Sequence, residues 1–297
     1  MPPSQNDYVI ETDRVSRFFK HTKALDEFNL RVPRGSIYGF LGRNGSGKTT
    51  AIKILAGLIK PTSGSVRVLG RDPFAFTAED RQKIGYVSEK QILPADFTVG
   101  RVIAFCSKFY PQWDDEVVSR LLGRFRIEPG HRIAALSQGT QRQVAFILAL
   151  APRPELLILD EPASTLDVVA RREFLDEILD LIRQEGRTVL ISSHILSDIE
   201  RVADHIGILV DGTLKVSEPL DELSDTIKQI RFYSFSRPDP LYSFPGALRA
   251  RLADQEILVT ARVRDESVVA QVARAAGAQY EIIDLPLEEI FVELSIR

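Results

Sequence analysis

Apolar and polar residues alternate from residue 8 to residue 32, and a turn at 33–35 leads into a strongly apolar run at residues 36–41. This pattern predicts extended structure that ends in a buried strand. A glycine-rich loop at residues 42–50 follows, and apolar residues then recur at helical spacing through residues 51–59. We therefore expect the order strand, glycine loop, helix near the start of the chain.

Further along, stretches typical of strands alternate with stretches typical of helices. Helical periodicity is found at residues 168–185 and 196–202, and apolar runs typical of strands lie at residues 65–69, 84–88, 156–160, 188–192, 206–210 and 213–216. The last two runs are joined by Asp211-Gly212, which predicts a hairpin turn because both residues readily accept positive φ. The alternation indicates an α/β core with a largely parallel sheet.

Two regions depart from this alternation. Residues from about 95 to 152 show mostly helical periodicity, which we interpret as a helical subdomain inserted in the sheet. From residue 229 the pattern predicts strands, one helix at 266–276, further strand structure and a closing helix at 286–294. We therefore predict a large domain of residues 1–228 and a small α+β domain of residues 229–297.

Composition narrows the classes of function. Hydrophobic residues make up 44% of the 297 residues, enough for a substantial core, and the net charge of −3 provides no basic field for nucleic acid. The lone Cys106 cannot form an internal disulfide, which fits a reducing, cytoplasmic setting. We expect neither a signal peptide nor a membrane-spanning segment, so any membrane role would come through a partner.

The glycine loop carries the first chemical motif. It has the form Gly42-x-x-x-x-Gly47-Lys48-Thr49, the pattern of a phosphate-binding loop, and it stands between a predicted strand and a predicted helix. Backbone N–H groups of such a loop face one anion, Lys48 reaches the β- and γ-phosphates, and the Thr49 hydroxyl binds magnesium. The simple alternative is a glycine-rich turn before an ordinary helix. The expected phosphate-binding residues are Gly42, Arg43, Asn44, Gly45, Ser46, Gly47, Lys48, Thr49 and Thr50.

A phosphate loop alone suits a kinase, a GTPase or an ATPase. The apolar run at 156–160 ends in two adjacent carboxylates, Asp160 and Glu161, followed by Pro162. Asp160 suits a magnesium role, and Glu161 is placed to polarise a water for attack on the γ-phosphate. Acid pairs after strands also serve as helix caps. The combination with the phosphate loop favours catalysis.

The segment Leu136-Ser137-Gln138-Gly139-Thr140 resembles LSGGQ, the signature of the ATP-binding cassette (ABC) family, and the resemblance extends over residues 8–215. It implies that Ser137 and Gly139 hold the γ-phosphate of ATP bound to the opposite subunit. Ser137 is equally suited to cap the helix that follows, and the two roles are compatible. Gln138 and Thr140 depart from the family pattern, which leaves open how tightly two subunits close.

Other residues match further family motifs. The segment 164–167 resembles the D-loop, in which Asp167 would link the two active sites, and His194 resembles the switch histidine that hydrogen-bonds the γ-phosphate. The resemblance implies that Phe19 stacks on adenine, with Phe18 as the competing residue. Glu89 stands where the family usually has the Q-loop glutamine.

The resemblance implies an α/β fold of the P-loop NTPase cassette type, with an antiparallel β-subdomain beside the largely parallel sheet. ATP and Mg²⁺ are the implied ligands, and a second copy or a paralogous subunit is the implied dimer partner. In family terms the catalytic residues are Glu161, His194 and Lys48, and the magnesium-binding residues are Thr49, Glu89 and Asp160.

The text at residues 97–114 resembles exporter-type ATPases that are encoded apart from their permease, and it contains Phe109, Tyr110 and Trp113. These aromatic residues either pack the helical subdomain or border the permease surface. We expect a subunit that hydrolyses ATP to power a separate membrane permease for export, bound at the cytoplasmic face of the membrane. The alternatives are a soluble, non-transport ABC ATPase that acts on a macromolecular partner, and a P-loop kinase, which would leave Ser137 and His194 unexplained.

Overall fold

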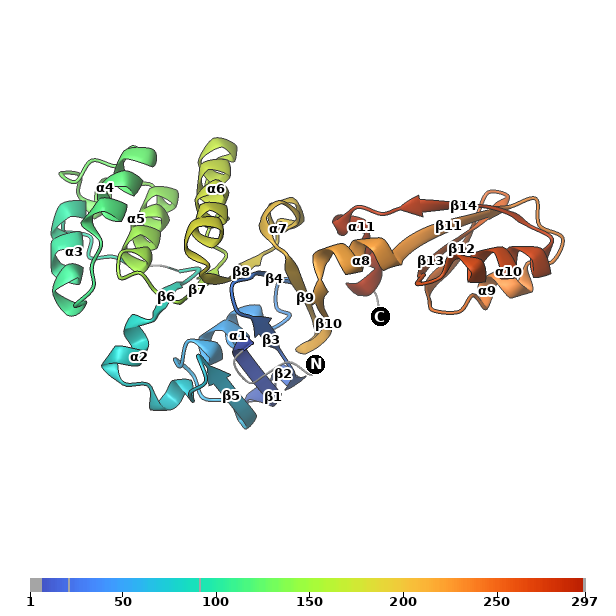
Figure 1. Cartoon of the computed structure of the whole chain (residues 1–297), viewed down its shortest axis with the longest axis horizontal. Coiled ribbons are helices and arrows are strands. Elements are labelled where there is room, and N and C mark those ends of the chain that lie inside the picture. The colour runs from blue at the N-terminus through green and yellow to red at the C-terminus, as the bar shows by residue number, and fades with distance from the viewer. Residues whose placement is uncertain (1–6, 21, 91, 296–297) are drawn as a thin grey trace. The chain divides into compact units, whose positions relative to one another are not determined.

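The computed structural model describes residues 7–20, 22–90 and 92–295. The chain divides into two compact units, Met1–Ser217 and Glu218–Arg297, whose elements are labelled in Figure 1. Residues 1–6, where no signal peptide is expected, lie outside the described residues. Within the described part of the chain, no helix is both long and apolar enough to cross a membrane.

The first unit begins with an antiparallel sheet, as expected for the β-subdomain. Strand β1 pairs antiparallel with three others. Residues Thr12 and Ser16 tie the strands together from inside, since the Thr12 hydroxyl donates to the main-chain oxygen of Phe28 at 3.0 Å. The strands are β1 (Tyr8–Phe19), β2 (Thr22–Phe28), β3 (Arg31–Pro33) and β5 (Ser63–Val68).

The second sheet of this unit has the order β10-β9-β4-β8-β7-β6, and the pairs from β9 to β6 are parallel. The predicted largely parallel sheet is therefore confirmed. Asp211 and Gly212 both have positive φ, 48° and 80°, so the predicted hairpin turn between β9 and β10 is confirmed. The strands are β4 (Ile37–Gly42), β6 (Ile84–Val87), β7 (Leu156–Asp160), β8 (Thr188–Ser193), β9 (His205–Val210) and β10 (Thr213–Pro219).

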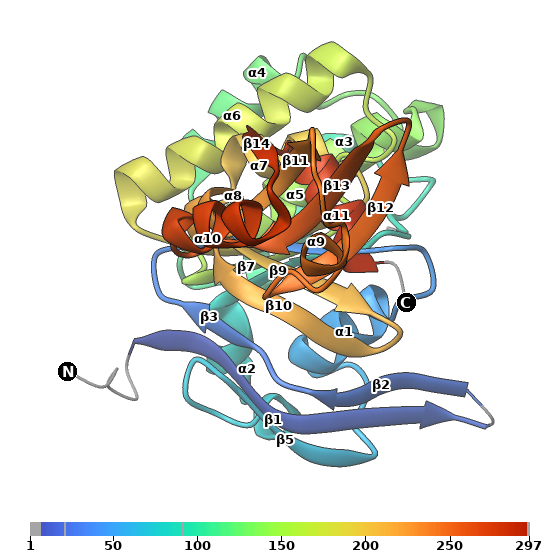
Figure 2. The same ribbon diagram turned by 90° about the vertical axis from the view of Figure 1, so that its right-hand side faces the viewer.

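Helices cover this sheet because its central strands are apolar on both faces. Every residue of β4, β7 and β8 is buried, as is usual for parallel strands between helices. Helix α1 (Lys48–Leu55) lies on one face, and α6 (Val168–Glu185) and α7 (Leu196–Val202) lie on the other (Figures 1 and 2). A short helix, α2 (Ala78–Gln82), precedes β6 and starts with a capping box between Thr77 and Asp80.

The helical subdomain consists of α3 (Val99–Cys106), α4 (Asp115–Arg124) and α5 (Gln138–Leu150). Each helix starts at a side-chain cap, provided by Thr98, Asp114 and Ser137 respectively. Short 3-10 turns lie at Pro73–Ala75, Ser107–Phe109 and Ile133–Ala135. The subdomain is anchored to α6 by Glu177, a buried carboxylate that accepts hydrogen bonds from Arg120 and Arg124 at 2.8 and 2.7 Å.

The second unit is built on a four-stranded antiparallel sheet of order β12-β13-β11-β14. Ile230, Phe232 and Val259 on the sheet and Val269 on α10 form its apolar core. Its elements are α8 (Leu220–Thr226), β11 (Ile227–Tyr233), α9 (Asp239–Tyr242), β12 (Ala247–Ala253), β13 (Glu256–Arg262), α10 (Glu266–Ala276), β14 (Gln279–Asp284) and α11 (Leu287–Ser295).

Two features of the second unit differ from the sequence predictions. The unit begins at Glu218 rather than residue 229, because α8 contacts β11 and Glu218 pairs with Arg262 at 2.7 Å. Strand β12 was not predicted. It is an edge strand with mostly exposed side chains, so it lacks the alternating pattern by which a half-buried strand is recognised.

Candidate active site

The glycine loop turns sharply between β4 and α1. Gly45 and Gly47 have φ of 83° and 108°, a region that side chains with a Cβ rarely adopt. A Cβ on Gly47 would also collide with the main-chain oxygen of Ala24 on β2. Gly47 precedes the first residue of α1 and makes no side-chain cap, so the N–H groups of the first turn have no side-chain acceptor there. The loop therefore has the form of an anion cradle at a helix N-terminus.

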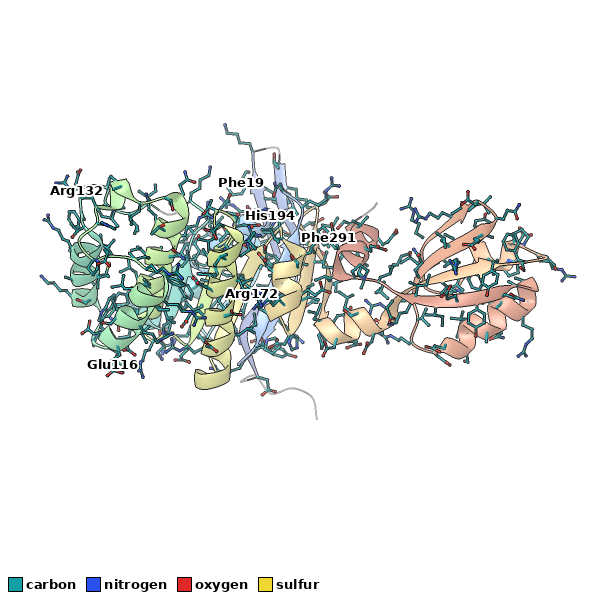
Figure 3. All side chains as sticks on the ribbon, turned by 90° about the horizontal axis from the view of Figure 1, so that it is seen from above. Phe19, Glu116, Arg132, Arg172, His194 and Phe291 are labelled. Carbon is teal, nitrogen blue, oxygen red and sulfur yellow. The ribbon has the colours of Figure 1, made fainter. Side chains whose placement is uncertain are left out.

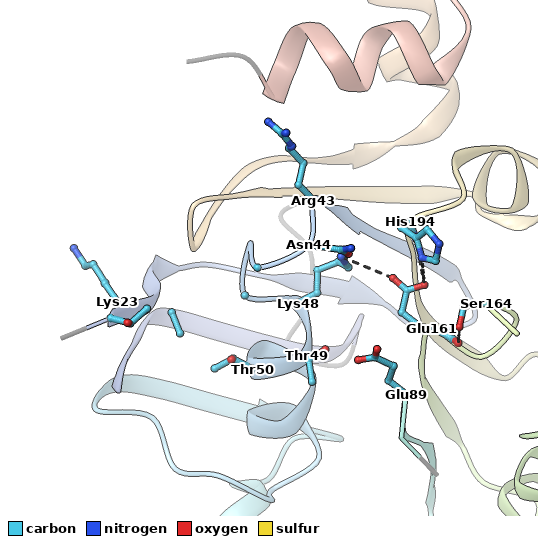
Figure 4. Close-up of a pocket in the computed structure, with 14 residues that line it drawn as sticks. Lys23, Arg43, Asn44, Lys48, Thr49, Thr50, Glu89, Glu161, Ser164 and His194 are labelled. Atoms are coloured by element: carbon cyan, nitrogen blue, oxygen red, sulfur yellow. Dashed lines mark hydrogen bonds and ion pairs between the residues drawn. The ribbon is translucent and has the colours of Figure 1, made fainter. Parts of the chain in front are cut away.

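A cleft of about 430 Å³ opens over this loop (Figure 4). Most of the predicted nucleotide residues border it, together with three carboxylate or imidazole side chains from other elements. Figure 4 shows the guanidinium of Arg43 directed away from the Glu161 carboxylate. The predicted residues that line the cleft are Arg43, Asn44, Gly45, Gly47, Lys48, Thr49, Thr50, Glu89, Glu161 and His194.

Glu161 stands at the centre of the site. It follows β7 and has a φ of 50°, a left-handed conformation that is strained for a residue with a Cβ. Its N–H donates to the Ser192 hydroxyl at 2.9 Å, which holds the turn against β8. One carboxylate oxygen lies 2.6 Å from Nδ1 of His194 and the other lies 3.8 Å from Nζ of Lys48 (Figure 4). The sequence-predicted catalytic set therefore converges.

Lys48 is the buried cation of this site. Its Nζ donates to the main-chain oxygen of Gly42 at 2.6 Å, so the side chain turns back over the loop. Burial lowers the pKa of Lys48, and the carboxylates of Glu161, Asp160 and Glu89 oppose that shift. Three carboxylates thus act electrostatically on one lysine. This excess of negative charge suits a site that takes a metal ion together with phosphates.

Asp160 lies beneath the cleft and is fully buried at 0% exposure. Its Oδ1 accepts a hydrogen bond from the Ser192 hydroxyl at 2.8 Å. Among the described residues, its Oδ2 is buried without a hydrogen-bond partner. Burial raises the pKa of Asp160, while Ser192 and the nearby Thr49 hydroxyl partly offset this effect. A buried carboxylate oxygen without a partner costs free energy unless something binds it, which fits a magnesium ligand.

The remaining predicted residues lie outside the cleft lining. Gly42 and Ser46 are packed together under the loop, where a Cβ on Gly42 would strike the Ser46 hydroxyl. Phe19 is 42% exposed on β1, and the guanidinium of Arg17 lies 4.5 Å from its ring centroid (Figure 3). Its competitor Phe18 is similarly exposed, with Nζ of Lys23 at 5.8 Å from the ring centroid. Both rings are thus accessible on the strand that leads to the cleft.

The signature and the D-loop contact each other on this chain. The Ser137 hydroxyl accepts from the N–H of Thr140 at 3.1 Å, so it caps α5. A Cβ on Gly139 would lie 3.0 Å from the main-chain oxygen of Thr165, which explains a glycine at that position. Asp167 accepts from the N–H groups of Val169 and Ala170, both at 2.9 Å, and so caps the start of α6. Ser137 and Asp167 are both exposed.

Several residues at the site were not predicted from the sequence. Thr22, Lys23, Ala24 and Ser164 line the cleft, and Ser192 orders the acid pair from below. The segment at residues 22–24 comes close only because the loop packs on β2. Ser164 lies within the predicted D-loop, so that motif was the one signal that pointed to it.

Comparison with known proteins finds similarity to ABC transporter ATP-binding proteins. The family model described as ABC transporter matches residues 25–164. The chain is 36% identical over 217 residues to the bacitracin transport ATP-binding protein BcrA of Bacillus licheniformis, an alignment that covers 72% of this chain and 71% of that protein. It is 31% identical over 223 residues to the ABC transporter ATP-binding protein YtrB of Bacillus subtilis, covering 75% of this chain and 76% of that protein.

Solved structures give the same picture. The structure of an ATP-binding subunit of an ABC transporter has a TM-score of 0.66 and 27% identity, and the match covers 73% of this chain and 92% of that one. A dimeric ATP-binding cassette in a post-hydrolysis state, bound to ADP and Pi, has a TM-score of 0.65 and 25% identity. This match covers 71% of this chain and 98% of that one.

The fold and the site together define a P-loop ATPase cassette. The chain belongs to the family of ABC transporter ATP-binding proteins, and it is an ABC-type ATPase.

Proposed function

We propose that this chain is the ATP-hydrolysing subunit of an exporter whose membrane-spanning part is a separate permease. The observation that carries the proposal is the convergence of Lys48, Glu161 and His194 over a phosphate loop. This set suits hydrolysis because it provides a carboxylate base beside a phosphate cradle.

The chemistry follows from the contacts of the Glu161 carboxylate. Glu161 accepts a proton from the attacking water, the water oxygen bonds to the γ-phosphorus, and the bond between that phosphorus and the β–γ bridging oxygen breaks, so that ADP leaves with the bridging oxygen. His194 holds the carboxylate through Nδ1 at 2.6 Å, which leaves Nε2 for a phosphate oxygen. Lys48 offsets the negative charge of the transferring phosphoryl group. Phe19 is proposed to stack on adenine, since its ring is exposed on β1.

Magnesium fits the remaining carboxylates. Thr49, Glu89 and Asp160 would hold it, and the partnerless Oδ2 of Asp160 supports this choice. No cluster of three or more His, Cys, Asp or Glu side chains able to hold a metal is found in the described ranges, so the nucleotide's own phosphates would complete the coordination. When bound, the ion supplies positive charge that stabilises the β- and γ-phosphates.

A second copy, or a paralogous subunit, would complete each site. Ser137 and Asp167 are exposed yet do not line this chain's own cleft, which supports a role toward ATP bound to a partner. A dimeric solved cassette is among the structures similar to this chain. ATP bound between the phosphate loop of one copy and the signature of the other would close the dimer, and hydrolysis would release it.

The permease would dock on the helical subdomain. The side chains of Phe105 and Phe109 are 53% and 61% exposed, and their rings meet edge-on at 5.2 Å, so Phe109 does not simply pack the subdomain. Tyr110 and Trp113 do lie partly buried against each other. An exposed aromatic pair suits a protein–protein contact.

The direction of export is proposed from the bacitracin and multidrug relatives. Through the permease the chain would sit at the inner face of the cell membrane.

The test of the catalytic proposal is Glu161→Gln, which keeps the shape of the side chain and removes the base. We expect hydrolysis to fall by about 100-fold or more and light scattering to detect an ATP-dependent dimer with twice the 33.3 kDa chain mass. Glu155→Gln is the matched control, because this exposed carboxylate immediately precedes β7 whereas Glu161 immediately follows it. Unchanged turnover without a stable dimer would contradict the proposal.

The test of the permease proposal is purification from detergent-solubilised membranes. We expect a polytopic membrane protein to co-purify with the wild-type chain and to be lost from the double variant Phe105→Glu, Phe109→Glu. Val292→Glu is the control, since Val292 is a comparably exposed apolar residue in the second unit. Recovery of nucleic acid or ribosomal proteins in place of a membrane protein would instead favour the non-transport alternative.

A further inference from the structure

Arg142 makes contacts that none of the family motifs explains. It is a half-buried residue on α5, the helix capped by Ser137. Its Nη1 donates to the main-chain oxygen of Glu161 at 3.0 Å and also contacts the Ser164 hydroxyl. Its Nη2 donates to the main-chain oxygen of Glu89 at 2.6 Å. One guanidinium thus joins the signature helix to both acidic loops.

The sheet register explains how one side chain reaches both loops. Strands β6 and β7 are parallel neighbours, and Val87 on β6 is paired with Leu159 on β7. Glu89 and Glu161 each lie two positions beyond this pair, so their main chains emerge side by side at the same edge of the sheet. The planar fork of a guanidinium can donate to two acceptors at this separation.

Glu161 needs such support because its backbone is strained. Its φ of 50° is held from one side by the Ser192 hydroxyl, which accepts from the Glu161 N–H. On the other side the Glu161 carbonyl accepts from Arg142 and from the Ser164 hydroxyl, the latter at 3.1 Å. A strained conformation persists only when its surroundings hold it. The direction of the Glu161 carboxylate therefore depends on these main-chain contacts.

We propose that Arg142 is a positioning residue for ATP hydrolysis, which holds the main chains of Glu89 and Glu161 in place relative to α5. The orientation of the Glu161 carboxylate then depends on the position of α5, the helix that begins within the signature. Arg142 is not part of the cleft lining and acts through Glu161 rather than on the nucleotide. This inference rests on the proposed role of Glu161 as the base.

The key variant is Arg142→Lys, which keeps the positive charge and most of the aliphatic stem but lacks the planar fork. Arg142→Ala removes the link altogether. We expect both variants to lower kcat, by about 10- to 100-fold for alanine, because small displacements of a reacting group have effects of this size. KM for MgATP, the Kd of a fluorescent ATP analogue and the thermal midpoint of the lysine variant should stay within about twofold or a few degrees of wild type.

The matched control is Arg153→Ala. Arg153 follows α5 in the chain and pairs with Asp114, the cap of α4, at 2.6 Å, but it is not among the residues that line the cleft. It should leave kcat unchanged even if stability falls. A purely structural role for Arg142 would instead give a lower thermal midpoint with a normal kcat for the folded fraction. Wild-type kcat in Arg142→Lys, or a loss of affinity equal to the loss of kcat, would overturn the proposal.

Glu161→Gln in the same assay separates the two levels of inference. If Glu161→Gln is inactive and Arg142→Lys is fully active, the positioning proposal alone fails. If Glu161→Gln hydrolyses ATP like the wild type, the role of Glu161 as base fails first.

Discussion

The two units of the chain bury different kinds of residue. The first unit buries Lys48, Asp160, Glu161 and Asp198 as well as apolar side chains, whereas Thr260 is the one buried polar residue among the described residues of the second unit. Buried charge costs stability unless it is paired or bound. The first unit therefore holds buried charges that need partners, while the second unit is organised around an apolar core.

From this difference between the units we expect the largest effect on activity at Lys48, the buried cation of the cleft. Lys48→Ala should lower the ATPase rate by about 100- to 1,000-fold, because it removes the positive charge that we propose offsets the charge of the transferring phosphate. Lys53→Ala is the control, since Lys53 is an exposed residue on the same helix. A steady-state ATPase assay checks this, and comparable rates in the two variants would contradict the role proposed for Lys48.

The second unit should respond in stability rather than in chemistry. Phe232→Ala removes a fully buried ring from its core and should lower the free energy of unfolding by about 3–5 kcal/mol. Trp113, the one tryptophan of the chain, lies in the first unit, so its fluorescence follows that unit while far-UV circular dichroism follows both.

We expect the dichroism transition of Phe232→Ala to shift and the Trp113 transition and kcat to stay as in the wild type. Leu252→Ala is the control, because Leu252 is 61% exposed in the same unit. A large loss of kcat in Phe232→Ala alone would show that the second unit takes part in catalysis.

A smaller, pH-dependent effect is expected within the helical subdomain. Burial alone would raise the pKa of Asp114, but hydrogen bonds from the Val117 N–H and from Arg153 outweigh it and lower the pKa. The stability that Asp114 contributes is therefore present at neutral pH and is lost as the pH falls below about 3.9, the ordinary Asp value. Asp114→Ala should cost about 1–2 kcal/mol at pH 7.

Chemical denaturation at pH 7 and at pH 3 measures this difference. The gap between Asp114→Ala and wild type should shrink at the lower pH, whereas the exposed neighbour Asp115→Ala should change little at either pH. A gap that is equal at both values would contradict the assigned ion pair and cap.

The smallest effect is expected at Glu89. Glu89→Gln restores the residue that the family usually carries and removes one of the three carboxylates around Lys48. Magnesium binding needs only one or two protein carboxylates beside the phosphates, so kcat should stay within about fivefold, or 1 kcal/mol of barrier. An ATPase assay over a magnesium titration checks this, and an inactive variant would contradict the assignment of Glu89.

Local sequence patterns predicted much of this site because its motifs are short and continuous. The phosphate loop and the acid pair each follow an apolar strand, so one stretch of sequence predicted both the strand and the site residues that come after it. His194 was inferred only from its resemblance to the family's switch histidine. The contacts of Arg142 and Ser192 could not be predicted, since they depend on the register between β6, β7 and β8.

The backbone conformation of Glu161 could not be predicted from sequence patterns either. Nothing in the residue type of Glu161 indicates a φ of 50°, because side chains with a Cβ rarely adopt it. The start of the second unit at Glu218 was also missed, since a pair between Glu218 and Arg262 joins residues far apart in the chain.

The central claim is that two chains together form each ATP-hydrolysing site. Its most direct test is the ATPase rate per chain as a function of chain concentration, measured alongside the mass of the particles by light scattering. We expect the rate per chain to rise with concentration and to fall toward zero where the chain is monomeric at 33.3 kDa. A constant rate per chain at concentrations where only monomers are present would contradict it.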